Sequence, residues 1–487
     1  MSLALEDPGL LRTRAFVDGH WIDADSGETL AVLNPATGET IAEVARCGQA
    51  ETRRAIAAAE RAQKDWARRT AKERAVLLRK LFDLMMANQE DLARILTAEQ
   101  GKPLAEARGE IAYSANFVDW FAEEARRVYG DTIPAHAADK RIVVIKQPIG
   151  VVACITPWNF PSAMLGRKIA PALAAGCAVV CKPANNTPLS AFAIAVLAER
   201  AGFPPGVINI LGGRTREIGD ELCANPAVRK LTFTGSTPVG KELMAKCAAT
   251  VKRTSMELGG NAPFIVFDDA DLDAAVAGAI ASKYRNAGQT CVCANRLLVQ
   301  DGVYEAFTAK LATAVAQFRL GDGAQDGINM GPLIDEGAAN EVMSFVEDAV
   351  AKGATVVTGG TRGSLGGSFV EPTILTNVST DMRVFNEEIF GPVAPVFRFS
   401  TEAEAIALAN DTPFGLASYF YARDIGRIWR VAEGLEYGIV GINEGIISTE
   451  VAPFGGVKES GSGREGSKYG IDDYLEIKYL CMGGIDR

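Results

Sequence analysis

The middle of the sequence alternates short apolar runs with Gly/Pro turns and helical patterns, and this alternation constrains the fold more than any other feature. Apolar runs lie at 151–155, 178–181, 207–211 and 231–234, and each is followed by a helical pattern. Short apolar strands that alternate with helices favour a parallel sheet of right-handed βαβ units. Ligands of such sheets bind beyond the carboxyl ends of the strands. The sequence therefore predicts an α/β fold with its site at that edge.

The flanking segments have different patterns. Residues 16–46 alternate β-rich runs with turn signals, which predicts a small antiparallel meander. Helical periodicity follows at 49–66, 71–98 and 102–128. A second α/β series runs from 262 to about 452. Residues 130–148 and the tail at 474–481 are both strand-like, so we expect the tail to pair with 141–148 or with a neighbouring subunit.

Composition narrows the class of partner and the compartment. The 487 residues carry 50 basic and 60 acidic side chains, a net charge of −10, which argues against nucleic acid or an anionic membrane as partner. No apolar run reaches the roughly 18 residues of a membrane helix. The first residues have neither a basic nor an apolar signal region. Nine scattered cysteines suit a reducing compartment. We therefore expect a cytoplasmic protein.

The stretch from Arg285 to Arg296 contains the most unusual cysteine of the chain. Gly288, Gln289 and Thr290 directly precede Cys291, and a polar setting is unusual for a thiol that only packs. The two histidines, at 20 and 136, are remote from the polar motifs, so neither a Ser-His-Asp triad nor a Cys-His pair is expected. No Cys/His cluster has zinc spacing, and we expect no metal.

Other polar stretches follow predicted strands. Thr156–Pro161 holds Asn159 between two prolines, and Lys182–Pro188 places a cation where a ribose or phosphate would bind. Phe233–Ser236 is a Gly/Ser turn into a helix N-terminus, a possible pyrophosphate cradle. Glu257 lies between a strand and two glycines, so its carboxylate is expected to face a cavity.

The ordered set PWNFP, KPxxxTP, FTGS, ELGG, GQTC, EEIFGP and PFGG resembles the NAD(P)-dependent aldehyde dehydrogenase superfamily over about residues 16–480. The region around Cys291 is most similar to the succinate-semialdehyde dehydrogenase branch, with glutarate-semialdehyde enzymes next. The resemblance implies a Rossmann-type parallel-sheet cofactor domain at 1–126 and 148–256 and a second α/β catalytic domain at 257–452. It also implies a small β oligomerisation element and tail at 127–147 and 453–487, and a homotetramer or dimer.

The same resemblance implies the catalytic roles. Cys291 would attack the aldehyde as a thiolate, because the deprotonated sulfur is the nucleophile. Asn159 and the Cys291 backbone N–H would hold the oxyanion, and Glu257 would activate the water that hydrolyses the thioester. Without a nearby histidine, activation of the thiol falls to the cofactor's positive ring, backbone dipoles or Glu257.

The implied cofactor is NADP or NAD. Its expected contacts are Thr156, Trp158, Lys182, Asn185, Gly235, Ser236, Glu388 and Phe390. Asn185 departs from the family pattern, because NAD-preferring relatives often carry a glutamate there. A neutral amide does not repel a 2′-phosphate, so we expect use of both cofactors with some preference for NADP.

The implied substrate is a small aldehyde with a distal carboxylate, which calls for arginine. Arg127, Arg285 and Ser448 match residues that bind this carboxylate in the succinate-semialdehyde branch. Glu444 is unexpected near the substrate mouth: it either points outward or indicates a different aldehyde. Cys293 could close a strained disulfide with Cys291 and switch activity off.

The predicted function is oxidation of succinate semialdehyde to succinate with NAD(P)⁺ through a covalent thiohemiacetal and thioester. A glutarate-semialdehyde or other aldehyde dehydrogenase is the alternative within the same class. A cofactor-independent cysteine esterase or hydrolase is a different class, which the Lys182 and Glu388 stretches argue against. A non-catalytic protein that has kept this fold is a third possibility, which the joint presence of Cys291, Glu257 and Asn159 disfavours.

Overall fold

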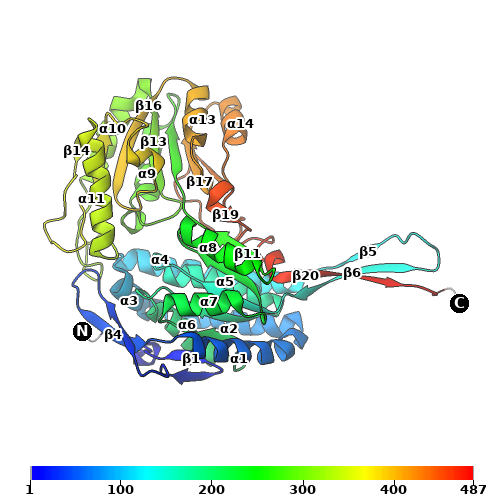
Figure 1. Ribbon diagram of the computed structural model, residues 1–487. Coiled ribbons are helices and arrows are strands. Elements are labelled where there is room, and N and C mark those ends of the chain that lie inside the picture. The colour runs from blue at the N-terminus through cyan, green and yellow to red at the C-terminus, as the bar shows by residue number, and fades with distance from the viewer. Residues whose placement is uncertain (1–2, 486–487) are drawn as a thin grey trace.

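An eight-stranded sheet organises the lower lobe in Figure 1 of the computed structural model, which describes residues 3–485. Its strand order is β19-β11-β10-β7-β8-β9-β1-β2. The central strands β11 to β9 are all parallel, as the sequence predicts. The bounds are β19 (Gly461–Ser462), β11 (Arg253–Glu257), β10 (Val228–Thr234), β7 (Val151–Ile155), β8 (Ala178–Lys182), β9 (Ile208–Ile210), β1 (Ala15–Val17) and β2 (His20–Ile22).

Helices cover both faces of this sheet because its strands are apolar on both sides. Alternate residues of β7, such as Val152 and Cys154, join the core formed with α2 to α6, whereas Val151 and Ala153 join the core beneath α1, α7 and α8. The bounds of these helices are α1 (Gln49–Arg68), α2 (Ala71–Ala87), α3 (Gln89–Gln100), α4 (Leu104–Glu124), α5 (Pro161–Ala175), α6 (Leu189–Ala201), α7 (Thr215–Ala224) and α8 (Thr237–Ala248).

The upper lobe holds a seven-stranded sheet of order β14-β15-β16-β13-β12-β17-β18, with all but the β14–β15 pair parallel. Its strands are β12 (Ala262–Val266), β13 (Ala294–Gln300), β14 (Thr355–Thr358), β15 (Thr373–Thr376), β16 (Val393–Phe399), β17 (Ala417–Tyr421) and β18 (Ile439–Ile442). Its helices are α9 (Leu272–Lys283), α10 (Tyr304–Val315), α11 (Glu336–Ala351), α12 (Arg383–Asn386), α13 (Glu402–Asn410) and α14 (Ile425–Gly434). The lobe has its own hydrophobic core.

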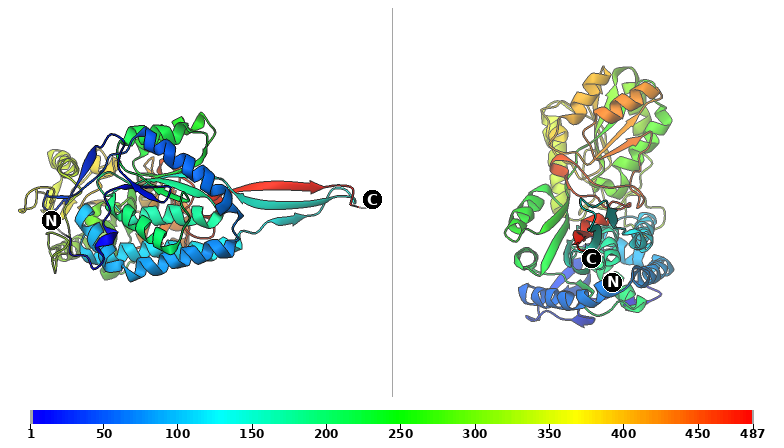
Figure 2. Two further views of the ribbon diagram at one scale, coloured as in Figure 1. Left: turned by 90° about the horizontal axis from the view of Figure 1, so that it is seen from below. Right: turned by 90° about the vertical axis from the view of Figure 1, so that its right-hand side faces the viewer.

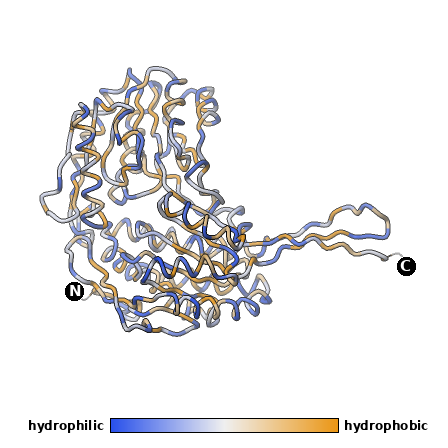
Figure 3. The backbone as a smooth tube through the Cα atoms, viewed as in Figure 1, coloured by the Kyte–Doolittle hydropathy of each residue, from blue (hydrophilic) through white to orange (hydrophobic). Residues whose placement is uncertain are grey.

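A three-stranded arm projects from the lower lobe and carries the C-terminal strand to its tip (Figures 1 and 2). It consists of β5 (Asp131–Ile133), β6 (Arg141–Pro148) and β20 (Leu475–Met482). The predicted pairing of the tail with 141–148 is confirmed, because β20 lies antiparallel to β6 from Leu475↔Pro148 to Met482↔Arg141. Apolar and polar residues alternate along the arm in Figure 3, and Ile477 and Tyr479 are 72% and 58% exposed.

Two local predictions were wrong. Residues 16–46 do not form one meander, because β1 and β2 extend the large sheet while β3 (Thr29–Leu33) and β4 (Thr40–Ala45) pair separately. The predicted helix at 71–98 is two helices. Asn88 interrupts it at φ −110° and ψ 20°, and its side-chain amide donates to the Leu84 carbonyl at 2.8 Å. An asparagine that bonds to the backbone in this way competes with helix continuation.

The domain boundaries stay predictions, although one pairing bears on them. The predicted tail element at 453–487 includes β19, which pairs antiparallel with β11 of the large sheet. Part of that segment thus returns to the lower lobe beside Glu257. No helix of the described chain is long and apolar enough to cross a membrane.

Candidate active site

Cys291 lies on a loop between a 3-10 turn (Arg285–Gly288) and β13, and it lines a cavity together with residues of both lobes. Asn286 and Ala287 both adopt φ of 53°, a left-handed conformation that costs non-glycine residues about 1–3 kcal/mol each. The surrounding contacts hold this strain: the Asn286 amide donates to the carbonyl oxygens of Asn159 (3.0 Å) and Gln289 (3.2 Å). These contacts therefore hold the loop that carries the thiol in its strained conformation.

Two glycines let neighbouring segments approach this loop. Gly288 has φ of +77°, and a Cβ there would collide with the Gly391 carbonyl on the segment that carries Glu388. A Cβ on Gly260 would collide with the carbonyl oxygen of Cys291. Glycine is needed at both positions because backbone approaches backbone directly.

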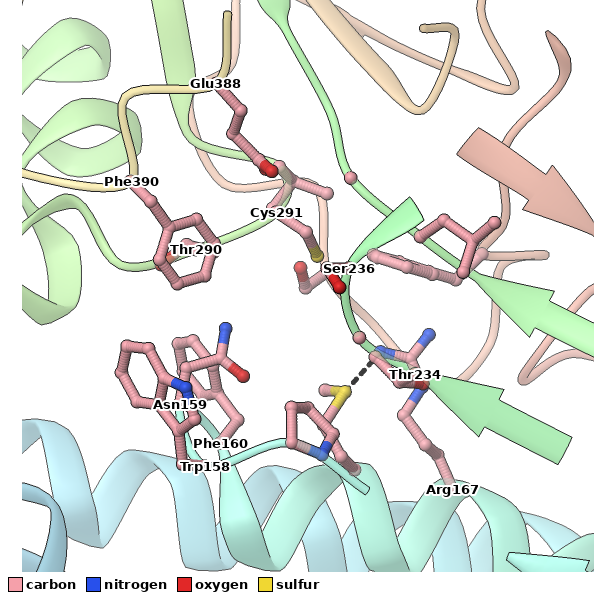
Figure 4. Close-up of a pocket in the computed structure, with 18 of the residues that line it drawn as sticks. Trp158, Asn159, Phe160, Arg167, Thr234, Ser236, Thr290, Cys291, Glu388 and Phe390 are labelled. Atoms are coloured by element: carbon pink, nitrogen blue, oxygen red, sulfur yellow. Dashed lines mark hydrogen bonds between the residues drawn. The ribbon is translucent and has the colours of Figure 1, made fainter. Parts of the chain in front are cut away.

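A cavity of about 270 Å³, which we call the Cys291 cavity, lies between this loop and helix α5. In Figure 4 the side chains of Cys291 and Asn159 enter the same space from opposite sides. Predicted site residues that line it are Cys291, Asn159, Trp158, Gly235, Ser236, Glu388, Phe390, Arg285 and Ser448. Residues from both lobes thus meet in one cavity.

The Cys291 thiol is protonated at neutral pH in this environment. Burial raises the pKa of Cys291 to about 12, with Glu388 and Glu257 acting in the same direction and Arg167 and Arg285 opposing them. At this pKa only a small fraction of the thiol is ionised near pH 7, and the thiolate is the reactive form.

We predict that alkylation of Cys291 by iodoacetamide accelerates about tenfold per pH unit between roughly pH 7 and 10, because the thiolate fraction grows tenfold per unit below the pKa. Peptide mass spectrometry after timed quenching measures this rate, and the exposed Cys481 reports reagent activity in the same sample. A rate for Cys291 that levels off below about pH 9 would contradict the elevated pKa.

Asn159 presents an amide with one proton left for a ligand. Its Nδ2 donates to the Gln289 carbonyl at 3.0 Å, and an amide NH₂ has two protons. Its Oδ1 is buried with no hydrogen-bond partner among residues 3–485. The amide is therefore held beside Cys291 with a free donor, the arrangement that an oxyanion requires.

Glu257 ends β11 and is buried, with Oε2 lacking a hydrogen-bond partner in the described chain. Burial and the neighbouring Glu465 raise its pKa well above the usual range, although Arg167, Lys168 and Arg464 oppose this. Glu465 itself accepts from Lys168 Nζ at 2.6 Å. Although burial opposes its ionisation, Lys168 and Arg167 lower the pKa of Glu465. Of these two acids, Glu465 is therefore the one whose ionised form is favoured, and the pKa of Glu257 is raised.

Two arginines line the Cys291 cavity. Arg167 of α5 and Arg285 both line it, together with Tyr113 and Ser448. Arg167 Nη2 and the Tyr113 hydroxyl are buried without hydrogen-bond partners in the part of the chain described. Burial raises the pKa of Tyr113, and both arginines oppose this shift, so the three groups are neighbours. Unpaired buried donors of this kind fit an anion.

Arg127 does not line the Cys291 cavity, and its contact with a substrate stays a prediction. It follows α4 in a short 3-10 turn, its Nη1 donates to Glu124 at 2.8 Å, and it lines a separate cavity with Lys146. Arg167 and Tyr113 were missed from the sequence. Glu444 is exposed, and its Oε1 accepts from the N–H groups of Gly445 and Ile446, each at 2.8 Å, so it stabilises its own loop.

The predicted cofactor residues fall into two groups. Phe390 lies across Trp158 in an edge-to-face pair at 5.6 Å, and Glu388 Oε1 accepts from the Gly260 N–H at 3.0 Å; burial raises the pKa of Glu388 to about 8. Gly235 and Ser236 directly precede α8 and line the Cys291 cavity.

Thr156, Lys182 and Asn185 lie farther along the carboxyl edge of the large sheet, outside the Cys291 cavity. Lys182 Nζ donates to Asn185 Oδ1 at 3.1 Å, and burial lowers the pKa of Lys182 to about 8. The Asn185 amide donates to the Gly213 carbonyl at 2.8 Å. The hydroxyl of Thr156 is buried and unpaired within the described residues, so polar groups remain available to a ligand along this edge.

Cys293 turns away from the Cys291 cavity. Its thiol donates to the Lys283 carbonyl at 3.0 Å, and both cysteines are free. A disulfide would require Cys293 to leave this carbonyl, and the redox role remains a prediction.

Comparisons with known proteins all return one family. The model of a family described as "Aldehyde dehydrogenase family" matches residues 21–480. A glutarate-semialdehyde dehydrogenase of Pseudomonas aeruginosa is 65% identical over 99% of this chain and 100% of its own. The succinate-semialdehyde dehydrogenase [NADP(+)] of Escherichia coli is 62% identical, with 99% and 100% covered. The crystal structure of succinate-semialdehyde dehydrogenase from Burkholderia pseudomallei superposes with a TM-score of 0.98 at 62% identity, covering 99% of this chain and 100% of that one.

Proposed function

The chain belongs to the aldehyde dehydrogenase family, and from that premise we propose that it oxidises succinate semialdehyde to succinate with NADP⁺ or NAD⁺. One observation carries the choice of substrate: Arg167, Arg285, Tyr113 and Ser448 line the same cavity as Cys291. A carboxylate accepted by the two arginines would place the aldehyde at the other end of the molecule near the sulfur. Arginine suits this task because its planar fork matches a carboxylate.

Three residues of the chain would have separate roles in the reaction. The Cys291 thiol would release its proton to solvent, and the thiolate sulfur would attack the aldehyde carbon, with Asn159 Nδ2 and the Cys291 backbone N–H donating to the developing oxyanion. The oxidised nicotinamide, when bound, supplies the acceptor for the hydride that leaves the substrate carbon. Glu257 would then accept a proton from the water that hydrolyses the thioester on Cys291, releasing the free acid.

The cofactor site we propose rests on groups that lack partners within the described chain. The hydroxyls of Thr156 and Thr234 are buried and unpaired, and Ser236 is the N-cap of α8, where a pyrophosphate is stabilised. The N–H of Gly235 already donates to the Glu257 carbonyl at 3.0 Å. Lys182 and Glu388 would hold the ribose hydroxyls. The neutral Asn185 would not repel a 2′-phosphate, and the E. coli relative is named for NADP(+).

A second candidate substrate is glutarate semialdehyde, because a relative that is 65% identical bears that name. One methylene separates the two substrates, which is worth about 1–3 kcal/mol of discrimination in a fitted pocket. Initial rates with both semialdehydes and with propanal, each against NAD⁺ and NADP⁺, separate these possibilities. Cofactor-independent turnover would instead support the esterase hypothesis.

We predict that Arg285→Ala and Arg167→Gln each lower kcat/KM for the semialdehyde roughly 10–100-fold relative to propanal, because each removes a charged hydrogen bond worth about 1.5–3 kcal/mol. Arg127→Ala is the matched control and should leave the ratio unchanged, since its guanidinium pairs with Glu124 outside the cavity. If the ratio falls for Arg127→Ala but not for the other two, the carboxylate lies elsewhere.

Two broader assignments also belong to the proposal. The exposed apolar residues of the arm, Ile477 and Tyr479 among them, support a homo-oligomer of two or four chains joined through this strand edge. Nine free cysteines support a reducing compartment such as the cytoplasm.

A further inference from the structure

A fully buried lysine contacts the backbone of Asn159 from outside the Cys291 cavity. Lys102 lies in the turn between α3 and α4, and its Nζ donates to the Asn159 carbonyl at 2.8 Å and to Glu110 Oε2 at 2.7 Å. The same ammonium sits 3.7 Å from the ring centroid of Phe160. Lys102 does not line the Cys291 cavity, so it touches the oxyanion residue without reaching the ligand space.

Glu110 continues this contact to the next helix. Its second oxygen accepts from the N–H groups of Ser162 (2.9 Å) and Ala163 (3.2 Å), at the start of α5. The ion pair therefore contacts both ends of the turn that carries Asn159. Lys102 donates to the Asn159 carbonyl, and Glu110 accepts from the first N–H groups of the helix that follows. Such a buried pair is weak evidence for stability, because desolvation offsets much of its attraction.

The loop that carries Cys291 contacts the same Asn159 carbonyl. The Asn159 carbonyl accepts a second hydrogen bond from Asn286 Nδ2 at 3.0 Å, and the Asn159 amide donates to Gln289, two residues before Cys291. Asn286 is one of the two left-handed residues of that loop. Among residues 3–485, Lys102 and Asn286 are the two side chains that donate to the Asn159 carbonyl. The position of Asn159 relative to Cys291 thus depends on these two hydrogen bonds.

We propose that Lys102, paired with Glu110, is a positioning residue that sets the Asn159 amide relative to Cys291. The inference rests on the proposed function only in that Asn159 donates to the oxyanion. Loss of the ammonium removes one of the two side-chain donors to the Asn159 carbonyl, and a misplacement of about 1 Å in a catalytic geometry can cost on the order of 10²-fold in rate.

The test compares Lys102→Met, Glu110→Gln and the double variant in the full-length protein. Methionine keeps an unbranched side chain against Phe160 while removing the ammonium. We expect Lys102→Met to lower kcat at least about tenfold with KM for aldehyde and cofactor within about twofold. It should also lower Tm, because Glu110 is left as an unpaired buried charge. The double variant should recover most of the lost Tm but not kcat, because the Asn159 carbonyl still lacks its donor.

Glu99→Gln is the matched control for Glu110→Gln. Glu99 is a buried carboxylate that accepts from Leu189 N (2.7 Å) and Ser190 N (2.8 Å) at the start of α6, away from the Cys291 cavity. It should lower Tm and leave kcat unchanged. A double variant that regains kcat together with Tm would overturn the proposal, since Lys102 would then be merely structural.

The readout also separates this proposal from the choice of substrate. A displaced oxyanion donor should lower kcat for the semialdehyde and for propanal by the same factor, because both form the same tetrahedral centre. A wild-type enzyme that shows no preference for carboxylated aldehydes would remove the proposed substrate and leave the Lys102 test intact. A Lys102→Met variant that changes the ratio of the two aldehydes, with kcat for propanal retained, would count against positioning of Asn159.

Discussion

Replacing Cys291 with serine should reduce kcat for aldehyde oxidation by on the order of 10⁴-fold or more, the scale of losing a covalent nucleophile. Serine preserves the shape of the side chain, but its hydroxyl is much harder to ionise than a thiol. The environment already opposes the charged form, since burial, Glu388 and Glu257 raise the pKa of Cys291. Neither histidine of the chain, His20 or His136, lines the Cys291 cavity, so no imidazole is in place to activate the serine.

Steady-state rates under reducing conditions measure this effect, with cofactor binding followed by protein fluorescence to show that the site is intact. Cys293→Ala is the matched control, because the Cys293 thiol donates to the Lys283 carbonyl instead of facing the cavity. It should retain kcat within about twofold. A Cys291→Ser variant with substantial activity would remove the covalent mechanism.

Two of the site residues that were predicted from sequence have a common structural origin. Asn159 follows β7 and Glu257 ends β11, and parallel strands of one sheet bring such positions to the same edge. Cys291 precedes β13 of the other sheet, and only the resemblance to a family of known fold indicated that it joins them. The βαβ rhythm could be recognised because each strand and helix carries its own local pattern.

Arg167 could not be found in this way because it lies inside an apolar helix. In α5 only Arg167 and Lys168 are charged, and both are buried. That composition was the available signal, since a charge in an otherwise apolar helix must meet a partner when buried. The location of Arg127 outside the Cys291 cavity could not be predicted, because an arginine after a helix has the same local sequence pattern whether it faces solvent or a cavity.

The pairing of β19 with β11 could not be predicted from the sequence, for a different reason. Strand β19 has only two residues, Gly461 and Ser462, yet it pairs with Met256 and Glu257 at the edge of the large sheet. Two residues carry no periodicity, so nothing local indicates this return. The pairing matters for the site because it brings Glu465 beside Lys168 and Arg167, and these charges set the environment of Glu257.

The final prediction concerns Glu257. We expect Glu257→Gln to form about one equivalent of reduced cofactor per chain in a burst and then to turn over roughly 10²–10⁴-fold more slowly, because the acyl group waits on Cys291 without a general base. Stopped-flow absorbance measures the burst, and mass spectrometry of the quenched protein detects the acyl group on Cys291. A variant that loses the burst together with turnover would place Glu257 before the thioester instead.

The pH dependence of thioester hydrolysis tests the role of Glu257 independently. Burial and Glu465 raise the pKa of Glu257, so the carboxylate that accepts the proton becomes more populated as pH rises. The hydrolytic phase of the wild-type enzyme should therefore accelerate with pH until it passes this raised pKa, whereas a glutamine has no proton to lose and its residual phase should lack that rise. An unchanged pH profile in the variant would mean that another group, with Glu465 the nearest acid, accepts the proton from water.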